Sequence, residues 1–183
     1  MQLPMSDVAV LVIDMLNTYE HEDADVLARN VADIIDPLAG LVSRARERDD
    51  VDLIYVNDNY GDFDADFRDV VDAALDGQRP ELVQPIAPDQ NYLRLLKVRH
   101  SAFYASSLDY LLRRLETRKL ILTGQVTEQC ILYSALDAYV RHFPVIVAPD
   151  AVAHIDPELS DAALTMMAKN MHAEIVPAQK CLD

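Results

Sequence analysis

Uninterrupted apolar runs constrain the fold of this chain more than any other feature of its sequence. VAVLVID at residues 8–14 and VDLIYVN at 51–57 are rich in β-branched and aliphatic residues. Such runs are typical of strands that are buried on both faces, as the strands of a parallel sheet are. Further strands are predicted at 91–98, 119–124, 144–149 and 173–177.

Helical patterns separate these runs. Between residues 25 and 48, apolar residues recur at helical spacing, although Pro37 is expected to kink or divide that helix. Shorter helices are predicted near 66–75, 107–116, 128–141 and 157–170. The alternation predicts an α/β fold in which residues 1–183 form a single domain, with a three-layer, doubly wound, mostly parallel sheet and helices on both faces. The long connection at 58–89 is expected to serve as a functional cover.

The charge of the chain excludes some partners. The formal net charge is −15, and the short basic stretch of Arg44, Arg46 and Arg48 is interpreted as the solvated face of a helix. Nucleic acid and anionic membranes are therefore expected to be poor partners. The sequence shows no secretory signal pattern and no apolar stretch long enough to cross a membrane, which predicts a cytoplasmic location.

Cys130 and Cys181 are the only cysteines. Without a secretory signal, each is expected to be a free thiol rather than half of a disulfide. Cys181 lies close to the end of the sequence and is interpreted as a bystander in a mobile tail.

Three reactive side chains follow predicted strands. Asp14 ends the first strand, Lys97 lies near the end of the third, and Cys130 follows the strand at 119–124. In an open parallel sheet, ligands bind outside the carboxyl ends of the strands, so these residues are expected to meet at one edge. There a carboxylate can accept the proton of a thiol, while an ammonium group stabilises negative charge.

Cys130 carries the strongest chemical argument. In TGQVTEQC, Thr127 is a good candidate for the N-cap of a helix whose first turn contains Glu128, Gln129 and Cys130. The helix dipole and unpaired N–H groups favour a thiolate there, so the pKa of Cys130 is expected to fall. The same N–H groups could stabilise an oxyanion.

Each of these residues also has an ordinary interpretation. A free cysteine is most often a small buried hydrophobe, an aspartate after a strand is often a turn residue, and a lone lysine is often at the surface. Within the enzymatic interpretation, His100 or His154 could replace Asp14 as the partner of Cys130.

Four stretches of the chain resemble the isochorismatase-like family of cysteine hydrolases, which includes nicotinamidases and other amidases. They are the strand VLVIDMLN, the Lys-bearing segment LKVRHSAFYASSLDYLL, the block TGQVTEQC, and CILYSALDAYVRHFPVIVAPDAVA. The similarity spans residues 8–153 in the expected order, and the block that contains Cys130 is its most specific part.

The resemblance implies a mechanism and a site. Asp14 would act as general base, Lys97 would stabilise charge, and Cys130 would attack a small amide-type substrate to form a thioester. A cis peptide between Gln125 and Val126 would turn the Val126 N–H toward the Cys130 N–H to form an oxyanion hole. The resemblance implies self-association, and no cofactor is expected. Substrate contacts are expected from Asn57, Asn59, Tyr60 and Gln125, although a turn built from Asn and Gly61 would look the same.

The sequence also departs from the family. Many members carry Gln where this chain has Leu16, so a polar contact is missing there. Metal-containing nicotinamidases place an Asp and histidines after the second strand, whereas VNDNYGDF retains Asp58 without histidines. No metal site is therefore expected. An enol-ether hydrolase that does not need the thiol and a catalytically silent binding domain remain as alternatives.

Overall fold

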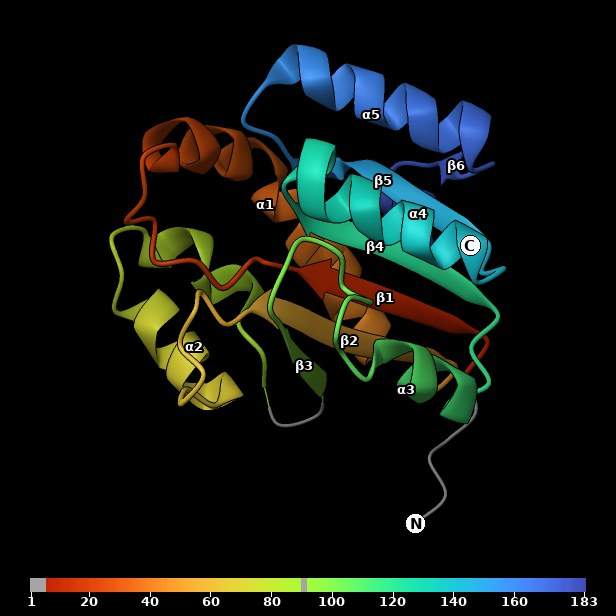
Figure 1. Cartoon of the computed structure of the whole chain (residues 1–183), viewed down its shortest axis with the longest axis horizontal. Helices are drawn as coiled ribbons and strands as arrows, with labels where there is room; N and C mark the ends of the chain where they lie inside the picture. The colour runs from red at the N-terminus through yellow and green to blue at the C-terminus, as the bar shows by residue number, and fades with distance from the viewer. Residues whose placement is uncertain (1–5, 90–91) are drawn as a thin grey trace.

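The computed structural model describes residues 6–89 and 92–183 and contains one six-stranded sheet in which every paired strand is parallel to its neighbour. The strand order is β3-β2-β1-β4-β5-β6 (Figure 1). The strands are β1 (Val8–Ile13), β2 (Val51–Asp58), β3 (Leu93–Lys97), β4 (Lys119–Gln125), β5 (Val145–Ala153) and β6 (Glu174–Ile175). The predicted α/β fold with a doubly wound parallel sheet is confirmed.

Helices cover both faces of the sheet. They are α1 (Ala24–Arg46), α2 (Phe67–Leu75), α3 (Leu108–Arg114), α4 (Leu132–Val140) and α5 (Pro157–Asn170). One core packs α1 and α2 against residues such as Val10 and Val12 of β1. The other packs α3, α4 and α5 against the alternate residues Leu11 and Ile13. Figure 1 shows α3, α4 and α5 on the near side of the sheet and α1 behind it, which gives the three predicted layers.

Local sequence signals explain the ends of the best-predicted elements. At the start of α5, the Asp156 carboxylate accepts hydrogen bonds from the backbone N–H groups of Glu158 and Leu159, and Pro157 occupies the first helical position. Both features are favoured at a helix N-terminus. In contrast, α1 continues through Pro37 without interruption, so the expected division of this helix is wrong.

The long connection at 58–89 has regular structure of its own. It contains α2 and two 3₁₀ turns, Pro80–Leu82 and Gln84–Ile86. Phe67, Val70 and Ile86 are buried in the same core as α1. Most of this segment is therefore part of the folded body, because its apolar residues pack against α1. Of the strand predicted at 91–98, Asn91 lies outside the described residues.

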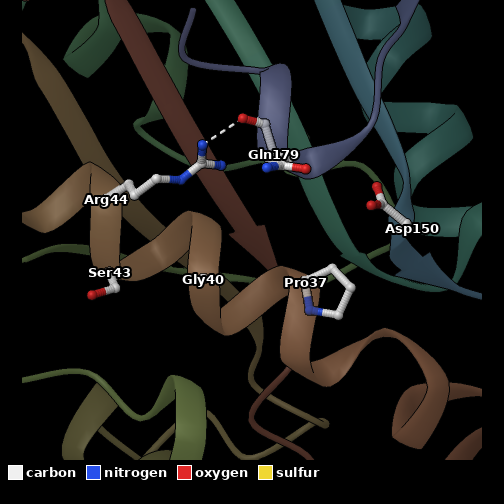
Figure 2. Close-up of a pocket in the computed structure, with 6 residues that line it drawn as sticks. All are labelled: Pro37, Gly40, Ser43, Arg44, Asp150 and Gln179. Atoms are coloured by element: carbon white, nitrogen blue, oxygen red, sulfur yellow. Dashed lines mark hydrogen bonds between the residues drawn. The ribbon is translucent and has the colours of Figure 1, made fainter.

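The basic residues at the end of α1 are tied to other parts of the chain rather than simply solvated. Arg44 donates to the backbone carbonyls of Ala178 and Gln179, and Figure 2 shows the bond to Gln179. Arg48 donates to the Leu182 carbonyl at 2.6 Å. These bonds hold the C-terminal segment against α1, and they correct the interpretation of this stretch as a solvated face.

The C-terminal segment is packed and not a loose tail. Cys181 is buried in the first core, and its thiol donates to the Val176 carbonyl at 3.3 Å. Cys130 and Cys181 are both free thiols, as predicted. Among residues 6–89 and 92–183, no helix combines the length and the apolarity that crossing a membrane requires.

Candidate active site

The strand order creates a crevice at the carboxyl end of the sheet. β1 lies between β2 and β4. The sheet continues through β2 to β3 on one side of β1 and through β4 to β5 and β6 on the other. Such a switch point is where open α/β sheets bind ligands. Asp14 directly follows β1, Lys97 ends β3, and Cys130 lies in the turn after β4. The sheet therefore brings the three predicted catalytic residues to one edge.

Gly124 allows β1 and β4 to approach closely at this edge. Its φ is +111°, and a Cβ atom built there would lie 2.0 Å from the Ile13 carbonyl oxygen. No side chain fits at that distance. A shift in the register between β4 and β5 occurs at the same point, between Leu122 and Gly124. The glycine thus lets the residues after it, including Gln125, lie directly beside Asp14.

Backbone and side-chain contacts from the two neighbouring strands, β2 and β4, fix Asp14. Its N–H donates to the Val56 carbonyl at 3.0 Å, and its Oδ1 accepts from the Asp58 N–H at 2.8 Å. Its carbonyl accepts from the Gln125 side-chain amide at 2.6 Å. Asp14 itself has a φ of +55°. These contacts aim the carboxylate across the ends of the strands toward Lys97 and Cys130.

Lys97 is fully buried among opposite charges. Its Nζ lies 2.8 Å from Asp14 Oδ2 and 3.2 Å from Asp58 Oδ2, and its side chain is 0% exposed. The distance from Nζ to the Cys130 Sγ is 3.8 Å. Burial alone would lower the pKa of Lys97, but Asp14, Cys130 and Asp58 together raise it. The lysine is therefore charged and can act only through electrostatics or hydrogen bonding.

Cys130 lies in a π-helical turn, Thr127–Ile131, that precedes α4. The predicted helix at 128–141 is thus divided, and Thr127 does not cap it, because its hydroxyl donates to the Ala153 carbonyl at 3.0 Å. The Glu128 carboxylate points away, accepting the N–H groups of Ile155 and Asp156 at 2.9 Å each. The peptide bond between Gln125 and Val126 is cis, the form that the resemblance implies.

The expected fall in the pKa of Cys130 is wrong. Burial raises the pKa of this thiol, and the negative charge of Asp14 raises it further. Lys97 and a hydrogen bond from the Val126 N–H oppose these effects without overcoming them. Burial also raises the pKa of the Asp14 carboxyl, against the opposing effect of Lys97 and of its hydrogen bond with Cys130. The resting site therefore holds a neutral thiol beside a carboxylate of increased basicity.

A cavity of about 340 Å³ opens above these residues. Its lining includes Asp14, Asp58, Val126 and Cys130, and four residues that the sequence analysis did not identify: Asn17, His21, Leu27 and Ile155. Asn17 and His21 follow the first strand closely, which is a signal that sequence reasoning could have used. Leu27 and Ile155 are ordinary apolar residues whose role depends on tertiary placement. The cavity is large enough for a small molecule.

The four predicted substrate contacts behave differently. Tyr60 and Gln125 line the cavity, although the Gln125 amide is bonded to Asp14. Asn57 is only 2% exposed, and its side chain both accepts from the Leu16 N–H and donates to the Leu16 carbonyl. Asn59 lines a neighbouring cavity, and its side chain accepts from the Gly61 N–H at 3.0 Å. The Asn57 amide thus ties β2 to the segment after β1, and the Asn59 amide closes a local turn.

The two histidine alternatives differ in position. His100 Nδ1 lies 3.9 Å from the Cys130 Sγ, and its ring centroid lies 5.5 Å from that of Tyr133. The backbone carbonyl of His154 accepts a hydrogen bond from the Asn30 side chain at 2.7 Å. Of these two histidines, His100 is therefore the one that the fold brings close to the thiol. Its distance to the sulfur is longer than the distance within the ion pair of Asp14 and Lys97.

Other parts of the described chain lack this combination of groups. In residues 6–89 and 92–183, no group of three or more His, Cys, Asp or Glu side chains is arranged to hold a metal ion. A larger groove of about 610 Å³ lies between α1 and the C-terminal segment (Figure 2). Its lining contains Arg44 and Asp150 but no cysteine. The reactive side chains are therefore gathered at the carboxyl end of the sheet.

Comparison with known proteins gives the family. The model of the isochorismatase domain matches residues 8–180. The isochorismatase family protein YaaI of Bacillus subtilis (strain 168) is 33% identical over 97% of this chain and 98% of its own length. Maleamate amidohydrolase of Pseudomonas putida is 30% identical over 81% of this chain and 74% of its own.

A solved structure supports the same fold. N-carbamoylsarcosine amidase from Thermoplasma acidophilum superposes with a TM-score of 0.75 at 24% identity, covering 97% of this chain and 99% of its own. At this level of identity the likeness establishes the fold alone. Because the family model matches nearly the whole sequence and the fold agrees, this chain belongs to the isochorismatase family of hydrolases.

Proposed function

We propose that this enzyme hydrolyses the C–N bond of a small amide through a thioester on Cys130. The observation that carries the proposal is the convergence of three groups at one cavity: Asp14 and Cys130 line it, and Lys97 is fully buried against them. Asp14 and Lys97 form an ion pair of 2.8 Å, the Cys130 sulfur lies 3.8 Å from the same lysine, and the charge of Asp14 raises the pKa of the thiol. The names of maleamate amidohydrolase and N-carbamoylsarcosine amidase support amide hydrolysis as the reaction class.

The first half of the reaction forms the acyl-enzyme. Asp14 accepts the Cys130 proton as the sulfur attacks the amide carbon, so the S–C bond forms and the carbonyl oxygen becomes an oxyanion. The backbone N–H groups of Val126 and Cys130 are proposed to bind this oxyanion. This is supported by the effect of the Val126 N–H on the pKa of Cys130, which it lowers against the effect of burial. The C–N bond then breaks, and the proton held by Asp14 passes to the leaving amine.

The second half regenerates the enzyme. Asp14, again a carboxylate, takes a proton from a water molecule that attacks the thioester carbon. The S–C bond breaks, a carboxylic acid leaves, and the sulfur recovers its proton. Through both halves the proton moves only between Asp14 and the reacting groups, so the charge of Lys97 stays in place. This fits a buried lysine whose pKa is raised by its neighbours.

The raised pKa of Cys130 is compatible with this role. A thiol that is neutral at rest is protected from unspecific reaction, and it becomes nucleophilic when the adjacent carboxylate removes its proton. The transfer moves a negative charge from Asp14 to the sulfur, next to the same Lys97 ammonium. The ion-pair partner of the lysine therefore changes while the net charge of the buried cluster does not.

Amide turnover by matched cysteine variants tests the proposal. Purified enzyme is assayed for ammonia release from a panel of primary amides and ureides and for acid release from esters. Cys130→Ala should lower turnover at least about a thousandfold, because a covalent route has no other nucleophile. Cys181→Ala removes the other buried thiol and should leave turnover within about twofold. His100→Ala should retain most activity if Asp14 is the base.

Three results would count against the proposal. Undiminished turnover in Cys130→Ala would favour hydrolysis without the thiol, as in an enol-ether hydrolase. A loss in His100→Ala as large as in Cys130→Ala would favour an imidazole base. Failure of the whole panel, together with a Cys130 that no alkylating agent modifies, would favour a silent binding domain. Self-association and a cytoplasmic location stay predictions from the sequence.

A further inference from the structure

The candidate site holds more negative than positive charge. Two carboxylates, Asp14 and Asp58, flank one ammonium group, Lys97, which leaves one negative charge uncompensated. Transfer of the Cys130 proton to Asp14 relocates charge inside the cluster but does not change this excess. A substrate therefore meets a negatively charged site both before and during the proposed reaction.

Asp58 is the carboxylate that exposes this excess negative charge to the cavity. Its side chain is 24% exposed and is part of the cavity lining. One carboxylate oxygen accepts from the Tyr60 N–H at 2.8 Å and the other faces Lys97 at 3.2 Å, so the group is held in place. Lys97, in contrast, is 0% exposed and is absent from the lining. A bound molecule consequently contacts the carboxylate rather than the ammonium group.

The rest of the lining offers no compensating cation. Besides the residues of the cluster it consists of neutral polar groups, apolar side chains and His21, with no lysine or arginine from residues 6–89 or 92–183. The positive charge of Arg79 acts to lower the pKa of the Tyr19 hydroxyl. The Arg79 guanidinium is itself paired with the Glu81 carboxylate at 2.6 Å. Of the histidines near the site, His21 is part of the lining, and His100 Nδ1 lies 3.9 Å from the Cys130 Sγ.

We propose, on the basis of the proposed function, that Asp58 makes this site selective for amides whose acyl part is neutral or positively charged. Amides whose acyl part carries a carboxylate are disfavoured. Two like charges about 5 Å apart at an effective dielectric constant of about 20 disfavour binding by roughly a hundredfold, and solvent at the partly exposed Asp58 reduces this to about tenfold. The negative exterior of the chain, with a net charge of −15, acts in the same direction.

Alkylation of Cys130 with a charge-matched pair of reagents tests the selectivity without a known substrate. Iodoacetamide and iodoacetate react with the same sulfur, are nearly equal in size and differ by one negative charge. Their rate constants at Cys130 are measured by peptide mass spectrometry at about pH 8 and moderate salt, in the Cys181→Ala background. The thiolate fraction is common to both reagents, so it cancels from the ratio of the two rates.

The expected ratio of the iodoacetamide rate to the iodoacetate rate is about tenfold higher at Cys130 than at a small free thiol. Asp58→Asn keeps the size of the side chain and should bring the ratio down at least about fivefold. Asp64→Asn removes the same charge from an exposed residue of the same connection that is not part of the lining. This control should leave the ratio within about twofold, because exposed charges are screened.

A parallel measurement uses butanamide, succinamate and 3-aminopropanamide, which are primary amides of similar length carrying no charge, a negative charge and a positive charge. Succinamate should have the lowest kcat/KM of the three, by about tenfold or more, and Asp58→Asn should narrow the gap. Because each variant is compared across substrates, a general loss of turnover in Asp58→Asn does not affect the result.

The outcomes separate this inference from the function on which it rests. A Cys130 that reacts with iodoacetate as readily as with iodoacetamide, relative to the free thiol, would overturn the charge selectivity and leave amide hydrolysis standing. An alkylation ratio unchanged by Asp58→Asn would remove Asp58 as its source. The expected alkylation ratio with no turnover of any amide would refute the proposed function but support the charge of the site. Failure of both reagents to modify Cys130 would overturn both.

Discussion

Replacing Asp14 by asparagine should affect catalysis and thiol reactivity in opposite directions. The substitution keeps the size of the side chain but removes both the proton acceptor and the negative charge beside Cys130. Loss of a general base costs about a hundredfold to ten-thousandfold in turnover. The charge of Asp14, however, raises the pKa of the Cys130 thiol. Its removal should therefore lower that pKa and increase the fraction of thiolate at any given pH.

The size of the second effect follows from the geometry. Asp14 Oδ2 and the Cys130 Sγ lie 2.8 Å and 3.8 Å from the same Lys97 Nζ, and the Asp14 side chain is 10% exposed. At about 4 Å and an effective dielectric constant of about 20, one unit charge contributes about 4 kcal/mol. Lys97 stands beside both groups and reduces the net effect, so we take about 1.4 kcal/mol, or about tenfold in thiolate, as the lower bound.

The assay measures both quantities on the same protein. Turnover of an amide substrate and the rate of Cys130 alkylation by iodoacetamide are compared between wild type and Asp14→Asn at about pH 7.5, well below the ordinary pKa of a thiol. We expect turnover to fall by about a hundredfold or more while alkylation becomes at least about tenfold faster. Retained turnover would remove Asp14 as the base. Slower alkylation in the variant would refute the charge argument for the raised pKa of the thiol.

Three further substitutions and one control test the scaffold of the site. Gly124→Ala should destabilise the protein by at least about 2 kcal/mol in urea denaturation, since a Cβ would lie 2.0 Å from the Ile13 carbonyl oxygen. Gly40→Ala has open space around its Cβ and should be neutral or stabilising by up to about 1 kcal/mol; equal effects of the two would contradict the explanation. Lys97→Met should cost about 3 to 5 kcal/mol near neutral pH by leaving Asp14 buried without its cation. Without Lys97 the folded-state pKa of Asp14 rises further. The loss of stability should therefore shrink as the pH falls toward about 4, where the unfolded chain also protonates this group. A loss of stability that is constant with pH would argue against this explanation. Asn57→Ala should lower stability by about 1 to 3 kcal/mol with little change in KM, because its amide pairs with the Leu16 backbone; a large rise in KM with unchanged stability would restore Asn57 as a substrate contact.

The fold could be predicted from the sequence because apolar runs and helix signals agree over long stretches. The run at 51–57 became β2 with a difference of one residue, and α5 has the predicted bounds, since Asp156 and Pro157 mark its start. The location of Asp14, Lys97 and Cys130 at one edge followed from their positions at the carboxyl ends of predicted parallel strands. That part of the site depends on topology, which a parallel sheet largely determines.

The properties that sequence reasoning missed depend on burial and on contacts distant in the chain. The pKa of Cys130 moves opposite to the expectation because the thiol is only 8% exposed and faces Asp14, neither of which a local helix pattern reveals. Thr127 has the right type and spacing for a cap, yet its hydroxyl bonds to Ala153 of a neighbouring strand. The role of Asp58 likewise depends on Lys97, 39 residues away in sequence.

Trapping the acyl-enzyme is the most direct test of the central claim that Cys130 is the nucleophile. An activated ester with the same acyl group as a good amide substrate is mixed with enzyme, because fast acylation lets the intermediate accumulate, and the reaction is stopped with acid during turnover. Mass spectrometry then locates any added acyl group. The proposed mechanism predicts the full acyl mass on the peptide that contains Cys130, its release by hydroxylamine, and its absence in Cys130→Ala. Continued turnover with an unmodified Cys130, or an acyl group found only on another residue, would contradict it.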